Sequence, residues 1–303
     1  MPVIETRNLV KKFKDLVAVN GVTLGIEEGE CFGLLGPNGS GKTTLIRMIT
    51  GVSPPNEGDI RVLDIDLKAY PRRVKAILGV VPQDENLDDD LTVLQNLTTF
   101  ARYFAIPIDE ARRRSIEVLD FFHLEDKHNS KMKELSGGMK RRLMLARGLI
   151  NQPEIMILDE PSVGLDPQAK HLVWQKLVEL KKQGVTQLLC TQNMEEAAIL
   201  CDRVAIMSLG KFIALDSPEA LISQYVGEDV LEIGVDATNR DKVIENLTKG
   251  EMDYTDAGNI VQVFHSSREE VIRVLDNAGG KLSQRAATLE DVFFGLTGRA
   301  LIE

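Results

Sequence analysis

Apolar and polar positions follow two different patterns over the first two thirds of the chain. Short apolar runs rich in β-branched residues alternate with longer segments in which apolar residues recur every three or four positions. This alternation predicts an α/β domain with a mostly parallel core sheet flanked by helices. The run from Glu154 to Leu158 is almost continuously apolar, as expected for a strand covered on both faces. The clearest predicted strands span residues 30–35, 78–81, 155–159, 187–191 and 203–208.

One helix in this region has clear signals at both ends. Asp166 is a suitable N-cap, Pro167 fits the first helical turn, and Gly184 lies just past the predicted end. Between residues 84 and 150, by contrast, helical periodicity replaces the strand signals. We therefore predict that residues 84–150 form a helical subdomain inserted into the α/β domain. Its clearest helices are predicted over residues 92–104 and 109–122.

The pattern changes again after Leu215. We predict a first domain over residues 1–225 and an accessory domain over residues 226–303. The accessory domain shows the order β-α-β-β-α-β followed by a short helix, which predicts a small α+β domain of the ferredoxin-like kind. Strands are predicted there at 229–235, 252–256, 259–265 and 281–287, and helices at 240–248, 267–276 and 289–295.

Composition and charge narrow the possible functions. With 43% hydrophobic and 27% charged residues, the chain can bury two cores and remain soluble. The net charge of −10 argues against nucleic-acid binding, which usually needs a basic face, although residues 140–142 form a local basic patch. No stretch approaches the roughly 18 apolar residues of a membrane-spanning helix, and the start of the chain lacks a signal peptide's apolar block. We therefore expect a cytosolic protein that meets a membrane only through a partner.

Residues 36–43 match the phosphate-binding pattern G-x-x-x-x-G-K-[ST], between an apolar strand and a helical stretch. Glycines let successive N–H groups curl around phosphates, and the helix N-terminus adds partial positive charge. Lys42 would contact the β- and γ-phosphates, and the Thr43 hydroxyl would bind Mg²⁺; a chance match in a glycine-rich turn is the alternative. The candidate ATP-binding residues here are Gly36, Pro37, Asn38, Gly39, Ser40, Gly41, Lys42, Thr43 and Thr44.

Two adjacent carboxylates end the apolar strand at 155–159. In phosphate-loop proteins such a strand end lies beside the loop, so Asp159 can hold Mg²⁺ through water. Glu160 points elsewhere and is placed to orient or deprotonate the attacking water. The alternative is a pair of solvated acids that cap the next helix.

A second candidate anion site begins a predicted helix with the sequence Leu-Ser-Gly-Gly at 135–138. Ser136 and the backbone N–H groups of Gly137 and Gly138 would sit at the helix N-terminus, which favours negative charge. Between the phosphate loop and the Asp-Glu strand, this sequence resembles the signature of ABC-transporter ATPases and is foreign to kinases and GTPases. The resemblance covers residues 1 to about 225. It implies a head-to-tail dimer, in which the signature of one copy closes on the ATP of a second copy or a homologue.

Further residues match motifs of the family in order. Gln83, after Val-Val-Pro, resembles the Q-loop residue that contacts Mg²⁺ or the attacking water. Phe13 stands where an aromatic ring stacks on adenine, although tyrosine is more usual there and a core aromatic is the alternative. Asp166 ends a segment that resembles the D-loop, with Val163 as a mild departure. The resemblance therefore implies ATP and Mg²⁺ as ligands.

One position departs from the family. Where the family places a histidine that contacts the γ-phosphate, this chain has Gln192, and Asn193 and Glu196 support the register as helix-capping residues. Glutamine donates one hydrogen bond but carries no positive charge and shuttles no proton. We therefore predict that ATP binding persists and hydrolysis is slowed, unless a neighbouring group compensates. The candidate catalytic residues are Glu160, Gln192 and Lys42.

The motifs and the accessory tail resemble the ATPases of bacterial and archaeal exporters, as in daunorubicin-type and nodulation-factor export systems. This resemblance predicts an ATPase peripheral to the inner face of the cell membrane and coupled to a separate permease subunit. Coupling would run through a groove near Gln83 and the acidic loop 84–90. The accessory domain would be regulatory, a dimer contact or a stabilising appendage. The alternative is a soluble ATP-gated switch that acts on nucleic acid or the ribosome, and the acidic charge disfavours it.

Overall fold

A computed structural model describes residues 2–275 and 278–297. These residues form two compact units, which divide between Leu215 and Asp216. The division lies ten residues before the domain boundary predicted at 225, because helix α8 (Pro218–Tyr225) packs against α11 (Leu289–Thr297) of the second unit.

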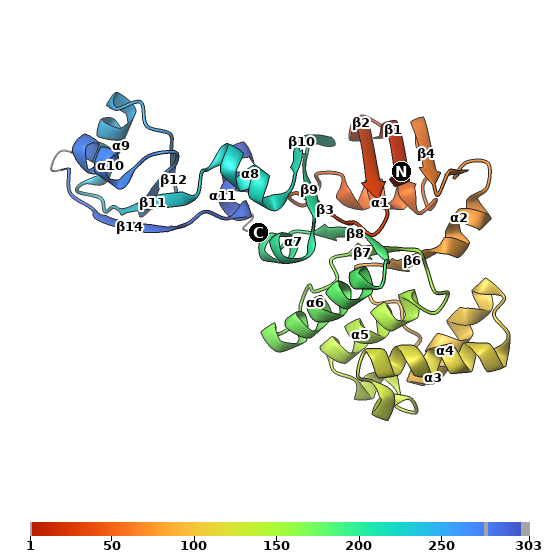
Figure 1. Ribbon diagram of the computed structural model, residues 1–303. Coiled ribbons are helices and arrows are strands. Elements are labelled where there is room, and N and C mark those ends of the chain that lie inside the picture. Colours follow the sequence, from red (N-terminus) through yellow and green to blue (C-terminus); the bar gives the residue numbers. More distant parts are fainter. Residues whose placement is uncertain (1, 276–277, 298–303) are drawn as a thin grey trace. The chain divides into compact units, whose positions relative to one another are not determined.

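The first unit is built on a six-stranded sheet in the order β10-β9-β3-β8-β7-β6 (Figure 1). The five strands from β9 to β6 pair in parallel, as the apolar runs predict. All five predicted strands are present, and only two of their ends differ from the prediction, by one residue each. The strands are β3 (Cys31–Leu35), β6 (Leu78–Val81), β7 (Ile155–Asp159), β8 (Thr186–Thr191), β9 (Arg203–Ser208) and β10 (Lys211–Asp216).

A second, antiparallel sheet in this unit does not appear in the sequence prediction. Its order is β2-β1-β4-β5, and Figure 1 shows its long strands lying side by side. Helix α1 contacts strands of both sheets, and one hydrophobic core joins side chains of α1 to both sheets. The strands are β1 (Pro2–Phe13), β2 (Leu16–Glu27), β4 (Glu57–Val62) and β5 (Ile65–Asp66), and α1 spans Lys42–Ile49.

Residues 84–150 carry α3, α4 and α5, which pack against one another (Figure 1). Thr92 and Gln95 form a capping box at the start of α3, which explains why the helix begins there. The predicted helix over 92–104 ends in a 3₁₀ turn, Arg102–Phe104. The helices are α3 (Val93–Ala101), α4 (Ile108–Phe121) and α5 (Gly137–Gly148), with two further 3₁₀ turns at Glu125–Lys127 and Met132–Glu134.

Three further helices complete the first unit. The predicted N-caps are both present: the Asp166 carboxylate accepts the Ala169 N–H at 2.9 Å, and the Asn193 amide oxygen accepts the Glu196 N–H at 2.9 Å. These caps fix where each helix begins after its strand. The helices are α2 (Pro71–Ile77), α6 (Pro167–Lys182) and α7 (Met194–Leu200).

The second unit contains the predicted order of strands and helices. Its sheet has the order β12-β13-β11-β14 with antiparallel pairing, and its core includes Leu231, Ile233 and Val263. The last residue of the helix predicted over 267–276 lies outside the described residues. The elements after α8 are β11 (Asp229–Gly234), α9 (Arg240–Lys249), β12 (Tyr254–Asp256), β13 (Ile260–Val263), α10 (Arg268–Leu275), β14 (Lys281–Ala286) and α11.

Candidate nucleotide site

Two glycines, Gly36 and Gly41, shape the loop after β3. Gly36 has φ 153° and Gly41 has φ 111°, backbone angles that L residues with side chains rarely adopt. A Cβ at Gly36 would lie 2.3 Å from the Met207 carbonyl oxygen, and one at Gly41 would lie 2.2 Å from that of Ala18. The loop therefore needs glycine at both positions for its backbone angles and for space.

Lys42 holds its ammonium group inside this loop. Its Nζ donates hydrogen bonds to the carbonyl oxygens of Gly36 at 2.7 Å and Pro37 at 3.1 Å, and the residue is only 6% exposed. Helix α1 begins at Lys42, and its N-cap, Gly41, supplies no side-chain hydrogen bond to the first turn, which includes Thr43 and Thr44. The loop thus combines a fixed positive charge with a helix N-terminus open to an anion.

Asp159 and Glu160 are both buried at the end of β7. Burial raises the pKa of each carboxyl group above its ordinary value, and the positive charge of Lys42 opposes that rise in both. Glu160 has φ 51°, a left-handed conformation that is uncommon for a residue with a side chain. The alternative of two solvated acids is therefore wrong, because these carboxylates are enclosed beside a lysine.

Gln192 joins the phosphate loop to the second carboxylate. Its Nε2 donates to the Asn38 side-chain oxygen at 2.9 Å, and its backbone N–H donates to Oε2 of Glu160 at 3.4 Å. The backbone N–H of Glu160 donates to the Cys190 carbonyl oxygen at 2.8 Å, and this bond fixes the backbone at Glu160. The position that departs from the family pattern therefore lies between Asn38, a candidate ATP-binding residue, and Glu160, a candidate catalytic residue.

The signature residues form a separate group at the start of α5. Ser136 is the N-cap, and its hydroxyl oxygen accepts the Met139 N–H at 3.3 Å. Gly137 and Gly138 are the first two helical residues, and a Cβ at Gly137 would meet no atom within 4 Å. Throughout the described part of the chain, no hydrogen bond joins these residues to the phosphate loop. The two candidate anion sites are therefore not brought together within this chain.

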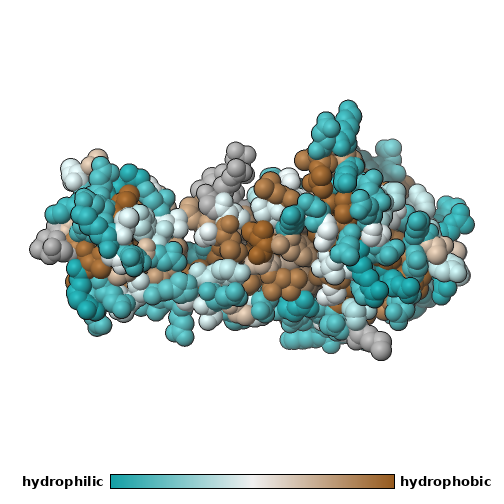
Figure 2. Space-filling model, turned by 90° about the horizontal axis from the view of Figure 1, so that it is seen from above, coloured by the Kyte–Doolittle hydropathy of each residue, from teal (hydrophilic) through white to brown (hydrophobic). Residues whose placement is uncertain are grey.

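The remaining nominated residues lie at exposed positions. Phe13 ends β1 and is 50% exposed, so the alternative of a core aromatic is wrong. The ammonium of Lys11 lies 5.2 Å from its ring centroid. Gln83 follows β6 and is exposed, as is Asp166 at the start of α6. Figure 2 shows that patches of hydrophobic residues reach a mostly hydrophilic surface, and Leu16 and Leu209 are further exposed apolar residues.

One buried residue at the site was missed by the sequence analysis. Arg141, counted there within a basic patch, is 6% exposed and donates hydrogen bonds to carbonyl oxygens of the Asp159–Pro161 and Pro82–Gln83 segments. Its neighbour Lys140 pairs with Glu85 at 2.8 Å. Every residue of α5 from Leu143 to Gly148 is buried, and the apolar run at residues 143–146 just after Arg141 was the available signal.

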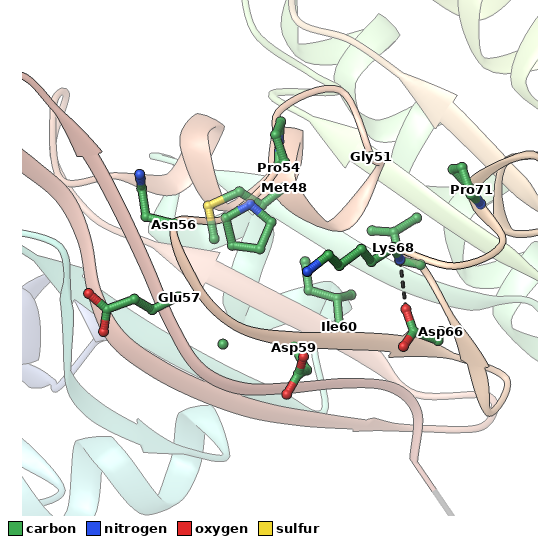
Figure 3. A pocket seen from close by; sticks show the side chains of 13 residues that line it. Met48, Gly51, Pro54, Asn56, Glu57, Asp59, Ile60, Asp66, Lys68 and Pro71 are labelled. Atoms are coloured by element: carbon green, nitrogen blue, oxygen red, sulfur yellow. Dashed lines mark hydrogen bonds between the residues drawn. The ribbon is translucent and has the colours of Figure 1, made fainter.

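A cavity of about 420 Å³ lies elsewhere in the first unit, as Figure 3 shows. Met48, Ile60 and Leu67 contribute apolar walls, while Asp59, Asp66 and Lys68 contribute charge. None of its lining residues was nominated for nucleotide binding. The candidate nucleotide site is therefore defined by its loop geometry and charges and not by this cavity.

Among the described residues, no helix is long and apolar enough to cross a membrane.

The core sheet and the phosphate loop define a P-loop nucleotide-binding protein. The family model described as ABC transporter matches residues 19–163. A relative from Burkholderia lata, Nod factor export ATP-binding protein I, is 44% identical over 306 residues, which cover 99% of each chain. The chain therefore belongs to the ABC transporter family, as an ATP-binding subunit with ATPase activity.

Solved structures agree with this assignment. A dimeric ATP-binding cassette in a post-hydrolysis state, bound to ADP and Pi, is 28% identical, with a TM-score of 0.65. The match covers 71% of this chain and 98% of that one. The cbiO1 protein from Clostridium perfringens, part of the ABC transporter complex cbiONQ, is also 28% identical, with a TM-score of 0.68 over 74% of this chain and 91% of that one.

Proposed function

We propose that this chain is the ATP-driven motor of an export system, in which two copies close head to tail on two ATP molecules and drive a separate membrane permease. The observation that carries this proposal is the bridge from Asn38 through Gln192 to Glu160, because it gathers the phosphate-binding and hydrolytic groups at one point. The Burkholderia lata relative is named for Nod factor export, which supports transport outward.

ATP binding would use the groups that already line the phosphate loop. The ammonium of Lys42 now rests on two neutral carbonyl oxygens, and a charged phosphate oxygen is a stronger acceptor than either. The uncapped N–H groups at the start of α1 would bind the same phosphates. Phe13, half exposed at the end of β1, would stack on the adenine.

Hydrolysis would depend on Glu160 as the base that takes a proton from the attacking water. Burial raises its pKa above the ordinary value, which makes it a stronger base, while the hydrogen bonds of Gln192 and the charge of Lys42 oppose that rise. Gln192 would turn its amide from Asn38 to the γ-phosphate as a neutral donor. Because this donor lacks the charge of a protonated histidine, we expect slow turnover with tight ATP binding.

The residues at the site fit a magnesium ion. Oδ1 of Asp159 is a buried carboxylate oxygen without a hydrogen-bond partner among the described residues, and such an oxygen suits a hard cation. Asp159, with the Thr43 hydroxyl and the Gln83 amide oxygen, would hold the ion. When bound, it would offset the negative charge of the β- and γ-phosphates.

Closure of a dimer would supply the second anion site. The helix N-terminus formed by Ser136, Gly137 and Gly138 makes no hydrogen bond to the phosphate loop of the same chain. In a dimer it would instead reach the ATP bound to the other copy. Asp166, exposed at the start of α6, would lie at this interface. The solved neighbour described as a dimeric cassette supports this arrangement. We assign ATP hydrolysis to the first unit, with 84–150 as the signature-bearing subdomain, and a regulatory or dimer-contact role to the second unit.

The permease would dock beside β6 at the inner face of the cell membrane. A cavity of about 250 Å³ lies there, lined by the apolar residues Val80, Phe100 and Phe104 and by the charged Lys75. A short amphipathic helix of a permease would bury its apolar face in such a groove. Gln83 follows the same strand, so movement of the docked helix would shift Gln83 at the nucleotide site.

Glu160→Gln in the full chain tests the proposed motor. We expect turnover to fall by at least about a hundredfold while ATP binding persists, because the amide cannot accept the proton from water. The variant should therefore accumulate as an ATP-bound dimer in light scattering, and Lys42→Met, the control, should lose both ATP and the dimer. A Glu160→Gln chain that binds ATP and stays monomeric would contradict the proposal.

The transport assignment has a separate test. The full chain, used as bait in detergent-solubilised membranes, should recover a protein with several membrane-spanning helices. Leu substitutions that fill the groove, such as Gly79→Leu, are unsuitable because a Cβ at Gly79 would lie 2.2 Å from the Gly148 carbonyl oxygen. Phe104→Glu instead places a charge in the groove and should reduce the recovery. Capture of ribosomes in place of the membrane protein would overturn the transport role.

A further inference from the structure

Arg141 connects three segments of the nucleotide site through main-chain carbonyl groups. Its Nε donates to the Pro161 carbonyl oxygen at 2.8 Å. One terminal nitrogen donates to the carbonyl oxygens of Asp159 at 2.8 Å and Glu160 at 2.7 Å. The other donates to the carbonyl oxygens of Pro82 at 2.8 Å and Gln83 at 3.3 Å. A single side chain therefore holds both carboxylate positions and the segment that contains Gln83.

The charge of this guanidinium matters because the surrounding groups are buried. Arg141 makes its hydrogen bonds to neutral carbonyl oxygens, while the carboxylates of Asp159, Glu160 and Glu196 lie close enough to interact with its charge. Glu196 is fully buried, and one of its oxygens accepts the Trp174 indole N–H at 2.8 Å. Loss of the cation would leave these carbonyl and carboxylate groups without compensation in a medium of low dielectric constant.

The backbone at Glu160 needs such support. Its φ of 51° is uncommon for a residue with a side chain, and conformations of this kind persist where surrounding contacts hold them. Arg141 binds the carbonyl oxygens of Glu160 and of the residues on both sides of it. The backbone that carries the Glu160 carboxylate is therefore held by the fifth residue of α5, the helix that the signature begins.

We propose that Arg141 is a positioning residue for ATP hydrolysis, which holds Glu160 and the Gln83 segment in one arrangement and links both to the signature helix. The inference rests on the proposed role of Glu160 as the base. Movement of α5 when ATP binds at its N-terminus would be passed directly to the carboxylate and to Gln83. ATP binding alone would not need this link, because no hydrogen bond of Arg141 reaches the phosphate loop.

Replacement of Arg141 by methionine and by lysine tests the inference. Methionine retains much of the volume but donates no hydrogen bond, so we expect kcat for ATP to fall about 10- to 100-fold with KM within about threefold of the parent. Lysine keeps the charge but reaches fewer carbonyl oxygens, so its kcat should lie between the two. Turnover is measured on the full chain, with ATP affinity and thermal melting recorded for each variant.

Arg147→Met is the matched control. Arg147 is equally buried in α5. Its guanidinium donates to the Asn86 carbonyl oxygen at 2.7 Å and lies 4.9 Å from the Phe100 ring centroid, and among the described residues it makes no hydrogen bond to residues 82–83 or 159–161. We expect it to lower the melting temperature as Arg141→Met does, but to keep kcat within about threefold of the parent. A loss of kcat equal to that of Arg141→Met would show a structural role only and would overturn the inference.

Two further outcomes are decisive. If Arg141→Met does not fold, Arg141→Lys decides: a reduced kcat at unchanged KM supports the inference, and the parent kcat overturns it. Glu160→Gln, assayed alongside, separates the two proposals. Parent-level turnover in Glu160→Gln would remove the proposed role of Glu160, and with it the ground for this inference. Lost turnover in Glu160→Gln with parent-level kcat in both Arg141 variants would overturn the inference alone.

Discussion

The two helix N-termini nominated for anion binding are built in opposite ways. At α1 the N-cap is Gly41, which supplies no side-chain hydrogen bond, and the buried Lys42 stands beside it. At α5 the N-cap is Ser136, whose hydroxyl already accepts the Met139 N–H, and no atom crowds Gly137. The first site is open within one chain, whereas the second is already capped by Ser136 and leaves only Gly137 of its two glycines uncrowded. The difference agrees with the proposed dimer, in which the loop at α1 binds the nucleotide and α5 acts on the nucleotide of another copy.

The largest effect is expected at the phosphate loop. Gly41→Ala should reduce ATP affinity by more than about a hundredfold, because the new Cβ would lie 2.2 Å from the Ala18 carbonyl oxygen and force the loop out of shape. Calorimetric titration with ATP measures the loss. Gly39→Ala is a useful control, since its Cβ meets no atom within 4 Å and only the positive φ of 78° opposes it. Normal affinity in Gly41→Ala would mean that this loop does not bind the phosphates.

Gln192→His tests how much the side chain at position 192, between Asn38 and Glu160, contributes to ATP turnover. A charge-assisted bond to the γ-phosphate could contribute roughly 2–3 kcal/mol, so we expect turnover to rise by up to about a hundredfold over the parent. Phosphate release at saturating ATP gives the rate. Equal or lower turnover in Gln192→His would show that a neighbouring group already compensates for the missing histidine.

Gly137→Ala probes the outward-facing signature. Because a Cβ there meets nothing within 4 Å of the same chain, the variant should fold normally and bind ATP as a monomer with parent affinity. In the dimer, however, the methyl group would stand between α5 and the phosphate, so ATP-dependent dimerisation should weaken by about tenfold. Analytical ultracentrifugation with and without ATP measures both states. A dimer of parent strength would place the interface elsewhere.

The smallest effect concerns stability. Burial raises the pKa of Asp159, because its charged form is disfavoured in the folded chain. At neutral pH the charged carboxylate therefore lowers the free energy of unfolding. This cost disappears when the pH falls below the raised pKa and the group is protonated. Asp159→Asn should therefore raise the melting temperature of the nucleotide-free chain by about 2–4 °C at neutral pH. The gain should shrink as the pH falls. A melting temperature that drops at neutral pH would show that the carboxylate is already compensated. ATP turnover should be lost in the same variant.

The sequence predicted the structure correctly where a short local pattern is typical of one kind of element. The strands of the core sheet were found because both of their faces are apolar, and the starts of α6 and α7 were found because Asp166 and Asn193 can cap a helix. The antiparallel sheet was missed, since its strands mix buried and exposed positions without strict alternation, as in β1. Arg141 was missed because its charge suggested the surface, although the apolar run at residues 143–146 follows it almost directly.

The sequence by itself determined the family, the phosphate loop and the nominated carboxylates, because these depend on residue types at fixed spacings along a short stretch of chain. Only the tertiary structure decided which of these groups meet. Asn38 and Gln192 are 154 positions apart in the chain, yet they share a hydrogen bond. Arg141 reaches Pro82 and Glu160 through carbonyl oxygens that any residue would provide. Contacts made through the backbone leave no trace in residue identity, and for that reason the fold was needed to find them.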